Sequence, residues 1–148
     1  TTALDVTVQK EVLALIKQLV NEDGMGLLLI SHDLGLMHDQ VDRVMVMYGG
    51  SVVESSATPA LFAHRAHPYT RGLFAARPRL GLARGTRLTT IPGSVPELMD
   101  MPAGCAFADR CEWAVADCHL TPPQAETIEC RPASELTHTV TCPRWRLT

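Results

Sequence analysis

The chain has 148 residues, 46% of them hydrophobic, with a formal net charge of -3 and an isoelectric point near 6.0. This length and hydrophobic content suffice for a packed core, and the weakly acidic balance argues against a nucleic-acid partner. No uncharged apolar stretch is long enough to cross a bilayer, so we expect any membrane association to come through a protein partner.

The first predicted element is a helix over residues 6–22. Hydrophobic residues recur in it at helical spacing, which predicts one buried stripe: Val8, Val12, Leu15, Ile16, Leu19 and Val20. Asp5 is placed to cap the amino end of this helix, and Gly24 is placed to end it.

A wholly apolar run, residues 26–30, predicts a strand buried on both faces in a parallel sheet. Polar residues just past the carboxyl end of such a strand lie where α/β sheets bind ligands, which makes His32 a candidate functional residue. The alternative is that Ser31 and Asp33 cap the next helix and that His32 is an ordinary loop residue.

A short amphipathic helix is expected from Leu34, followed by a hairpin whose strands, 43–48 and 51–54, flank the turn Gly49-Gly50. Thr58 and Pro59 predict an N-cap and first turn for a helix that covers Ala60 to about Ala66. A further helix start is expected at Pro68, and residues 77–90, with four arginines, read as an exposed connector.

All five cysteines lie in a Pro-rich tail that begins at residue 91: Cys105, Cys111, Cys118, Cys130 and Cys142. So small and loop-dominated a region needs a covalent or metal staple, and disulfides, zinc and iron–sulfur ligation are the candidates. Five residues separate the first two cysteines and six separate the next two, unlike the C-x2-C knuckles of zinc ribbons. Four thiolates suit a [4Fe-4S] cluster.

The first part of the chain resembles the ATPases of ABC transporters from their D-loop to their H-loop, in order, spacing and flanking residues. The resemblance implies an α/β fold, namely the C-terminal part of a P-loop NTPase (ABC ATPase) domain followed by a small, loop-rich, cysteine-containing extension. It also implies that Ala3, Leu4 and Asp5 form the D-loop at the interface between two ATPase subunits. His32 would be the switch histidine, which acts on the γ-phosphate and the attacking water of ATP.

The tail resembles that of oligopeptide and dipeptide importer ATPases, in its His67-Pro68-Tyr69 segment and in its cysteines. Some of those proteins bind a [4Fe-4S] cluster. The resemblance implies the ligands Cys105, Cys111, Cys118 and Cys142, with Cys130 left over. Zinc, or no metal, is the alternative, and the reducing compartment of such an ATPase disfavours disulfides. For His138, a structural hydrogen bond is favoured over metal ligation.

On this resemblance we divide the chain into an ATPase portion (1–56), a helical segment with its connector (57–90) and the cysteine-rich extension (91–148). The chain begins with Thr1 inside the D-loop and contains no G-x-x-x-x-G-K-[ST] phosphate loop. We therefore expect a piece of a longer protein. The intact protein would use ATP and Mg²⁺, whereas this part would be inactive alone.

The resemblance implies the ATP-hydrolysing subunit of an ABC importer that moves peptides across the cytoplasmic membrane, bound peripherally at the cytoplasmic face. Its implied partners are a second ATPase subunit, identical or different, the transmembrane permease subunits and, indirectly, an extracytoplasmic solute-binding protein. Nickel import, or a stand-alone metal- or redox-binding module, is the alternative reading.

Overall fold

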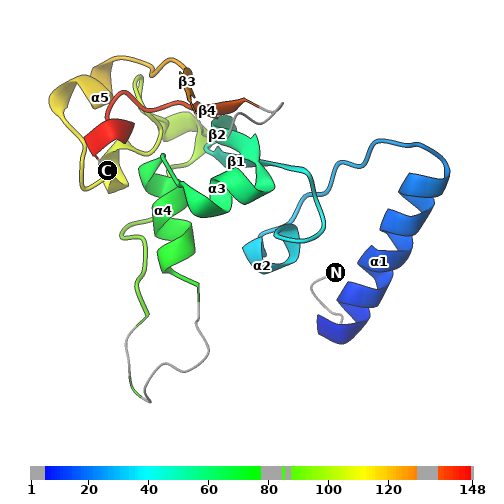
Figure 1. The fold of residues 1–148 in the computed structure, drawn as a ribbon. Helices are drawn as coiled ribbons and strands as arrows, with labels where there is room; N and C mark the ends of the chain where they lie inside the picture. Colours follow the sequence, from blue (N-terminus) through cyan, green and yellow to red (C-terminus); the bar gives the residue numbers. More distant parts are fainter. Residues whose placement is uncertain (1–5, 78–84, 86–87, 130–136, 148) are drawn as a thin grey trace. The chain divides into compact units, whose positions relative to one another are not determined.

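The computed structural model describes residues 6–77, 85, 88–129 and 137–147 (Figure 1). They belong to two compact units, Thr1–Asp42 and Arg43–Thr148, and the protein is α/β with a small antiparallel sheet. The predicted D-loop residues Ala3, Leu4 and Asp5 lie outside the described residues, and so does Cys130.

The first unit contains the predicted long helix, α1 (Val6–Glu22), and a single turn of helix, α2 (Leu34–Met37). Gly24 ends α1 as expected, because its φ of 60° is a left-handed conformation that glycine adopts without strain. The backbone N–H of Met25 then bonds back to the carbonyl of Val20 over 2.9 Å. The predicted bounds of this helix are confirmed.

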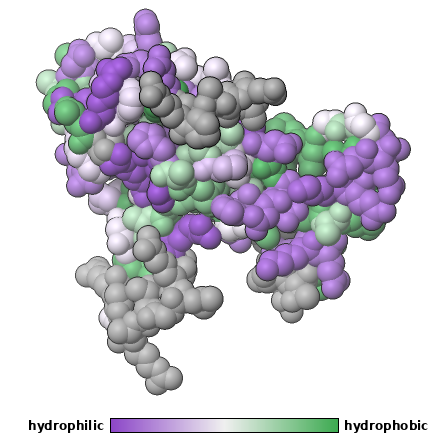
Figure 2. Space-filling model, viewed as in Figure 1, coloured by the Kyte–Doolittle hydropathy of each residue, from purple (hydrophilic) through white to green (hydrophobic). Residues whose placement is uncertain are grey.

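Two burial predictions for the first unit are wrong. The apolar stripe of α1 is open, with Leu15 58% exposed, and hydrophobic residues are visible on the surface of this unit in Figure 2. Residues 26–30 form no strand, and Ile30 is 89% exposed. A strand needs a hydrogen-bonded neighbour, and the described residues of this unit provide none.

The second unit begins with the predicted hairpin, β1 (Arg43–Tyr48) and β2 (Ser51–Ala57), which is confirmed. Gly49 and Gly50 have φ angles of 56° and 81°, and Tyr48 pairs with Ser51 across them. Positive φ at both central residues gives the turn whose twist matches that of paired strands, so this hairpin follows from local sequence.

The cysteine-rich tail extends this hairpin into a four-stranded sheet. The strand β4 (His138–Val140) pairs antiparallel with β2 on one side and with β3 (Glu126–Ile128) on the other, in the order β1-β2-β4-β3. Sequence analysis predicted a loop-dominated tail and missed both strands. Three residues are too few to display the alternating pattern from which a strand is recognised.

Two helices, α3 (Thr58–Ala63) and α4 (Pro68–Ala75), follow the hairpin. The first begins and ends earlier than predicted: Ala57 holds the N-cap position, and Thr58 is a buried residue of the first turn. The helix cannot run to Ala66 because the backbone N–H of Ala66 donates to the Glu54 carboxylate over 2.7 Å. Proline at the start of α4 is as predicted.

Short elements complete the tail: α5 (Ala116–Leu120) and the 3-10 turns Leu98–Asp100, Ala108–Arg110 and Trp145–Leu147. A core of Ala66, Ile128, Val140 and Cys142, with Trp145 against it, joins the tail to the chain that follows the hairpin. Within the part of the chain that the structure describes, no helix has the length and apolar character needed to cross a membrane.

Candidate functional site

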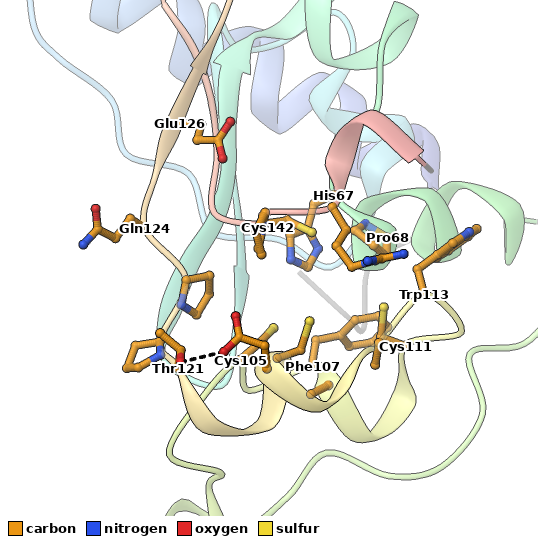
Figure 3. Close-up of a pocket in the computed structure, with 18 residues that line it drawn as sticks. His67, Pro68, Cys105, Phe107, Cys111, Trp113, Thr121, Gln124, Glu126 and Cys142 are labelled. Carbon is orange, nitrogen blue, oxygen red and sulfur yellow. Dashed lines mark hydrogen bonds between the residues drawn. The ribbon is translucent and has the colours of Figure 1, made fainter.

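A pocket of about 260 Å³ lies within the second unit, between α4, α5 and the end of β4 (Figure 3). The four cysteines proposed as ligands all line it: Cys105, Cys111, Cys118 and Cys142. In Figure 3 the sulfur atoms of Cys105 and Cys111 point across the pocket toward Cys142 and the ring of His67. Cys105 and Cys142 are 37 positions apart in the sequence, and they nevertheless line the same pocket.

Backbone hydrogen bonds fix the first three cysteines relative to one another. The N–H of Cys105 donates to the carbonyl of Cys118 over 2.7 Å, which joins the start of this segment to α5. Ala108 N–H donates to the Cys105 carbonyl over 2.9 Å just before the 3-10 turn Ala108–Arg110, and Cys111 N–H donates to the Ala108 carbonyl over 3.1 Å at its end. A Cβ on Gly104 would lie 2.3 Å from the Cys118 carbonyl oxygen, so only glycine fits there.

Arg110 anchors the same turn to the rest of the unit. Its guanidinium donates to the carbonyls of Pro92 and Ile91 over 2.6 and 3.3 Å, and to the hydroxyl of Tyr48 over 3.2 Å. The Tyr48 ring also meets Phe107 edge to face, with ring centres 5.2 Å apart. The cysteine-bearing turn is therefore held against β1.

The four thiols are free, and burial raises the pKa of Cys105, Cys111 and Cys142. The pKa of Cys142 rises to about 11, chiefly through burial, and neighbouring cysteines raise it further. Burial is also the main cause of the raised pKa of Cys105 and Cys111. With their pKa values raised, these thiols stay protonated at neutral pH, so a metal would have to displace their protons.

The fit of the pocket to a metal group rests on its donor set. Four cysteine sulfurs line this one pocket, and thiolate sulfur is the ligand that both iron–sulfur clusters and zinc use. As they stand, no three or more His, Cys, Asp or Glu side chains among the described residues are arranged to hold a metal ion. Ligation would thus require loss of protons and closer approach of the sulfurs.

Beside the pocket lies a buried carboxylate that sequence analysis did not single out. Glu54, 1% exposed, accepts hydrogen bonds from Nε2 of His138 over 2.8 Å and from the backbone N–H groups of Ala66 and His67 over 2.7 and 2.9 Å. Burial raises the pKa of Glu54, but these donors and Thr70 outweigh it, and the net pKa lies below its ordinary value. The structural hydrogen bond that was predicted for His138 is confirmed.

His67 links this carboxylate to the cysteine pocket. Its ring caps α4, with Nδ1 accepting from the backbone N–H of Tyr69 over 3.1 Å, and it also lines the pocket. Burial lowers the pKa of His67 to about 4, against the opposing effect of the Glu54 carboxylate. The imidazole is therefore neutral at physiological pH.

His32 lies exposed in the first unit, just before α2. The capping alternative is confirmed for Asp33, which accepts from the N–H of Gly35 over 2.7 Å, whereas Ser31 accepts from the N–H of Asp33 over 3.0 Å and does not cap the helix itself. These bonds leave the His32 ring free of a capping role. The switch role of His32 stays a prediction, as do the roles of Ala3, Leu4 and Asp5.

Comparison with known proteins gives concordant results. Residues 53–118 match the family model described as "Oligopeptide/dipeptide transporter, C-terminal region". A protein of Brucella ovis named as a peptide import ATP-binding protein is 46% identical over 152 aligned residues, which cover 99% of this chain and 43% of that protein. A similarly named protein of Brucella suis is 46% identical over 88% of this chain and 43% of its own length.

A third relative, the oligopeptide transport ATP-binding protein OppD of Mycobacterium tuberculosis, is 46% identical over 84% of this chain and 20% of its own length. The chain thus spans less than half the length of the curated relatives that it matches. Segment 53–118 belongs to the C-terminal region of the oligopeptide/dipeptide transporter family, and the resemblance seen in the sequence is confirmed.

Proposed function

We propose that this chain is part of the ATP-hydrolysing subunit that powers ABC-type import of peptides across the cytoplasmic membrane. The observation that carries the proposal is the alignment of 99% of the chain with a peptide import ATP-binding protein at 46% identity. In this reading ATP and Mg²⁺ bind the intact subunit, and 1–56, 57–90 and 91–148 are its ATPase portion, helical segment and cysteine-rich extension.

The partners follow from the same proposal. Ala3, Leu4 and Asp5 would lie against a second ATPase subunit, and transmembrane permease subunits would hold the pair at the cytoplasmic face of the membrane. A solute-binding protein outside the membrane would act indirectly. His32 would orient the γ-phosphate and the attacking water, a contribution made in the transition state.

His32→Ala tests the function in the full-length protein assembled with its permease partners. Because a transition-state contact contributes to kcat, we expect ATP turnover to fall about 100-fold with little change in the Kd for ATP. His38→Ala, which removes another exposed histidine of the same unit, is the matched control and should leave turnover intact. Unchanged turnover in His32→Ala would contradict the switch role, and stimulation by Ni²⁺ instead of peptides would favour nickel import.

We further propose that Cys105, Cys111, Cys118 and Cys142 hold a [4Fe-4S] cluster, with zinc as the alternative. Support comes from the convergence of these four free cysteines on one pocket and from spacings unlike those of zinc knuckles. When bound, the cluster would supply a one-electron redox centre. The protein's own contribution is the frame: the Cys105–Cys118 backbone bond, the 3-10 turn and the end of β4.

Anaerobic purification of the full-length protein tests this site. We expect a brown protein with iron and acid-labile sulfide in equal amounts, bleached by dithionite. Serine at any of the four positions should abolish the colour, because a thiolate ligand is lost, whereas Cys130→Ser should keep it. A colourless protein with stoichiometric zinc would replace the cluster by zinc, and loss of metal in Cys130→Ser would refute the ligand set.

A further inference from the structure

Two residues that line the cysteine pocket, His67 and Arg144, each have a buried side-chain nitrogen without a hydrogen-bond partner among the described residues, and His67 is the more deeply buried of the two. His67 is 1% exposed, and its Nε2 makes no hydrogen bond to any described residue. A buried polar group left unpaired destabilises the folded protein, so proteins keep few of them. The unpaired Nε2 of His67 therefore favours a hydrogen-bond partner inside the pocket.

The hydrogen bond on the other side of the ring fixes which nitrogen carries the proton. Nδ1 accepts from the backbone N–H of Tyr69 over 3.1 Å, which requires a bare nitrogen at that position. In the neutral ring the proton then resides on Nε2. A protonated nitrogen cannot ligate a metal but can donate to an acceptor, so His67 is a hydrogen-bond donor toward the pocket.

The ring has little freedom to turn away. The backbone N–H of His67 is tied to Glu54 over 2.9 Å, and proline at the next position fixes the first turn of α4. The Phe107 ring lies with its centre 6.0 Å from that of the imidazole. Figure 3 shows the His67 ring beside Cys142, with Cys105 and Cys111 facing it.

From these contacts we infer that Nε2–H of His67 donates a hydrogen bond to a sulfur of the group held by the four cysteines, as a positioning residue that is not itself a ligand. This inference rests on the proposed cluster. Hydrogen bonds to cluster sulfurs stabilise the more negative, reduced form and so raise the reduction potential. His67 would also slow loss of the cluster by holding one sulfur in place.

Two substitutions distinguish the role of Nδ1, which caps α4, from that of Nε2, which faces the pocket. His67→Asn keeps an acceptor where Nδ1 stands, so it still caps α4, but nothing reaches the position of Nε2. His67→Gln places an amide nitrogen near the position of Nε2 and loses the cap. If His67 acted only through its cap on α4, His67→Gln would change the potential and the cluster loss more than His67→Asn.

The experiment is a redox titration of the anaerobically purified full-length protein, followed by the rate of cluster loss to a chelator. We expect a more negative midpoint potential and several-fold faster loss in His67→Asn, and values nearer the wild type in His67→Gln. Unfolding curves record the capping effect separately. His119→Asn, at an exposed histidine of α5, is the control.

The outcomes distinguish the two proposals. A brown wild-type protein whose potential and cluster loss are unchanged in His67→Asn would overturn the hydrogen bond and leave the cluster standing. A glutamine variant that matches the asparagine variant in both readouts would overturn it as well. A colourless wild-type protein would overturn the cluster and this inference together.

Discussion

At the scale of single residues, the most consequential group outside the cysteines is Glu54. It is the shared acceptor for His138 in β4 and for two backbone N–H groups between α3 and α4. A charged acceptor that serves several buried donors stabilises the fold only while all of them are present. Three segments that are distant in sequence thus depend on one side chain.

Glu54→Gln should destabilise the full-length protein at neutral pH. The amide matches the size of the carboxylate but offers one acceptor oxygen and turns an NH2 group toward backbone donors, so we expect a loss of about 2–3 kcal/mol in the free energy of unfolding. Denaturant unfolding measures it. Glu97→Gln, at an exposed glutamate, should change the free energy by less than about 0.5 kcal/mol.

The pH dependence of this difference follows from the lowered pKa of Glu54. A carboxyl whose pKa is lower in the folded than in the unfolded protein contributes stability above its unfolded pKa, and that contribution is lost as the pH falls through the folded pKa. The gap between wild type and Glu54→Gln should therefore be full near neutral pH and shrink below about pH 4.5. A gap that widens on acidification would contradict the assignment.

At the scale of elements, the cysteine site depends on how closely two segments approach. Gly104 leaves no room for a Cβ against the carbonyl of Cys118, and the Cys105 N–H bonds to that same carbonyl. Backbone atoms cannot yield as the end of a flexible side chain can. The segment before Cys105 and the helix α5 can lie together only because residue 104 is glycine.

Gly104→Ala should therefore separate these segments and impair the site. We expect a loss of at least about 2 kcal/mol in unfolding free energy and a several-fold lower metal content after anaerobic purification. Gly26→Ala, where an added Cβ would meet no atom within 4 Å, is the control and should match the wild type in both measurements. Full metal content in Gly104→Ala would show that the approach of these segments is dispensable.

At the scale of the whole molecule, what sequence alone could predict follows the range of the interactions. The bounds of α1, the Gly49-Gly50 turn and the proline start of α4 are set by neighbouring residues, and each was predicted. The common pocket of the four cysteines was anticipated through the family resemblance. The spacing of the cysteines alone did not decide between disulfides, zinc and an iron–sulfur cluster.

What could not be predicted depends on residues far apart. The pairing of β4 with β2 joins positions 84 and 86 apart, the bond between His138 and Glu54 joins positions 84 apart, and no local pattern marks either. The burial predicted for residues 26–30 failed for the related reason that a strand is a property of its neighbours as well as of its own sequence. The burial of His67 Nε2 without a partner likewise becomes visible only in the folded protein.

The position of β4 inside the sheet has a consequence for the order of assembly during synthesis. The hairpin emerges from the ribosome before β4, so β2 has no partner on its open edge, and Glu54 no bond to His138, until residues 138–140 have been made. The same late strand carries Cys142 into the pocket. Insertion of β4 is thus a checkpoint: a nascent chain cannot close this sheet without also delivering the fourth thiol, so any metal that the four cysteines bind would be loaded only after Cys142 has been made.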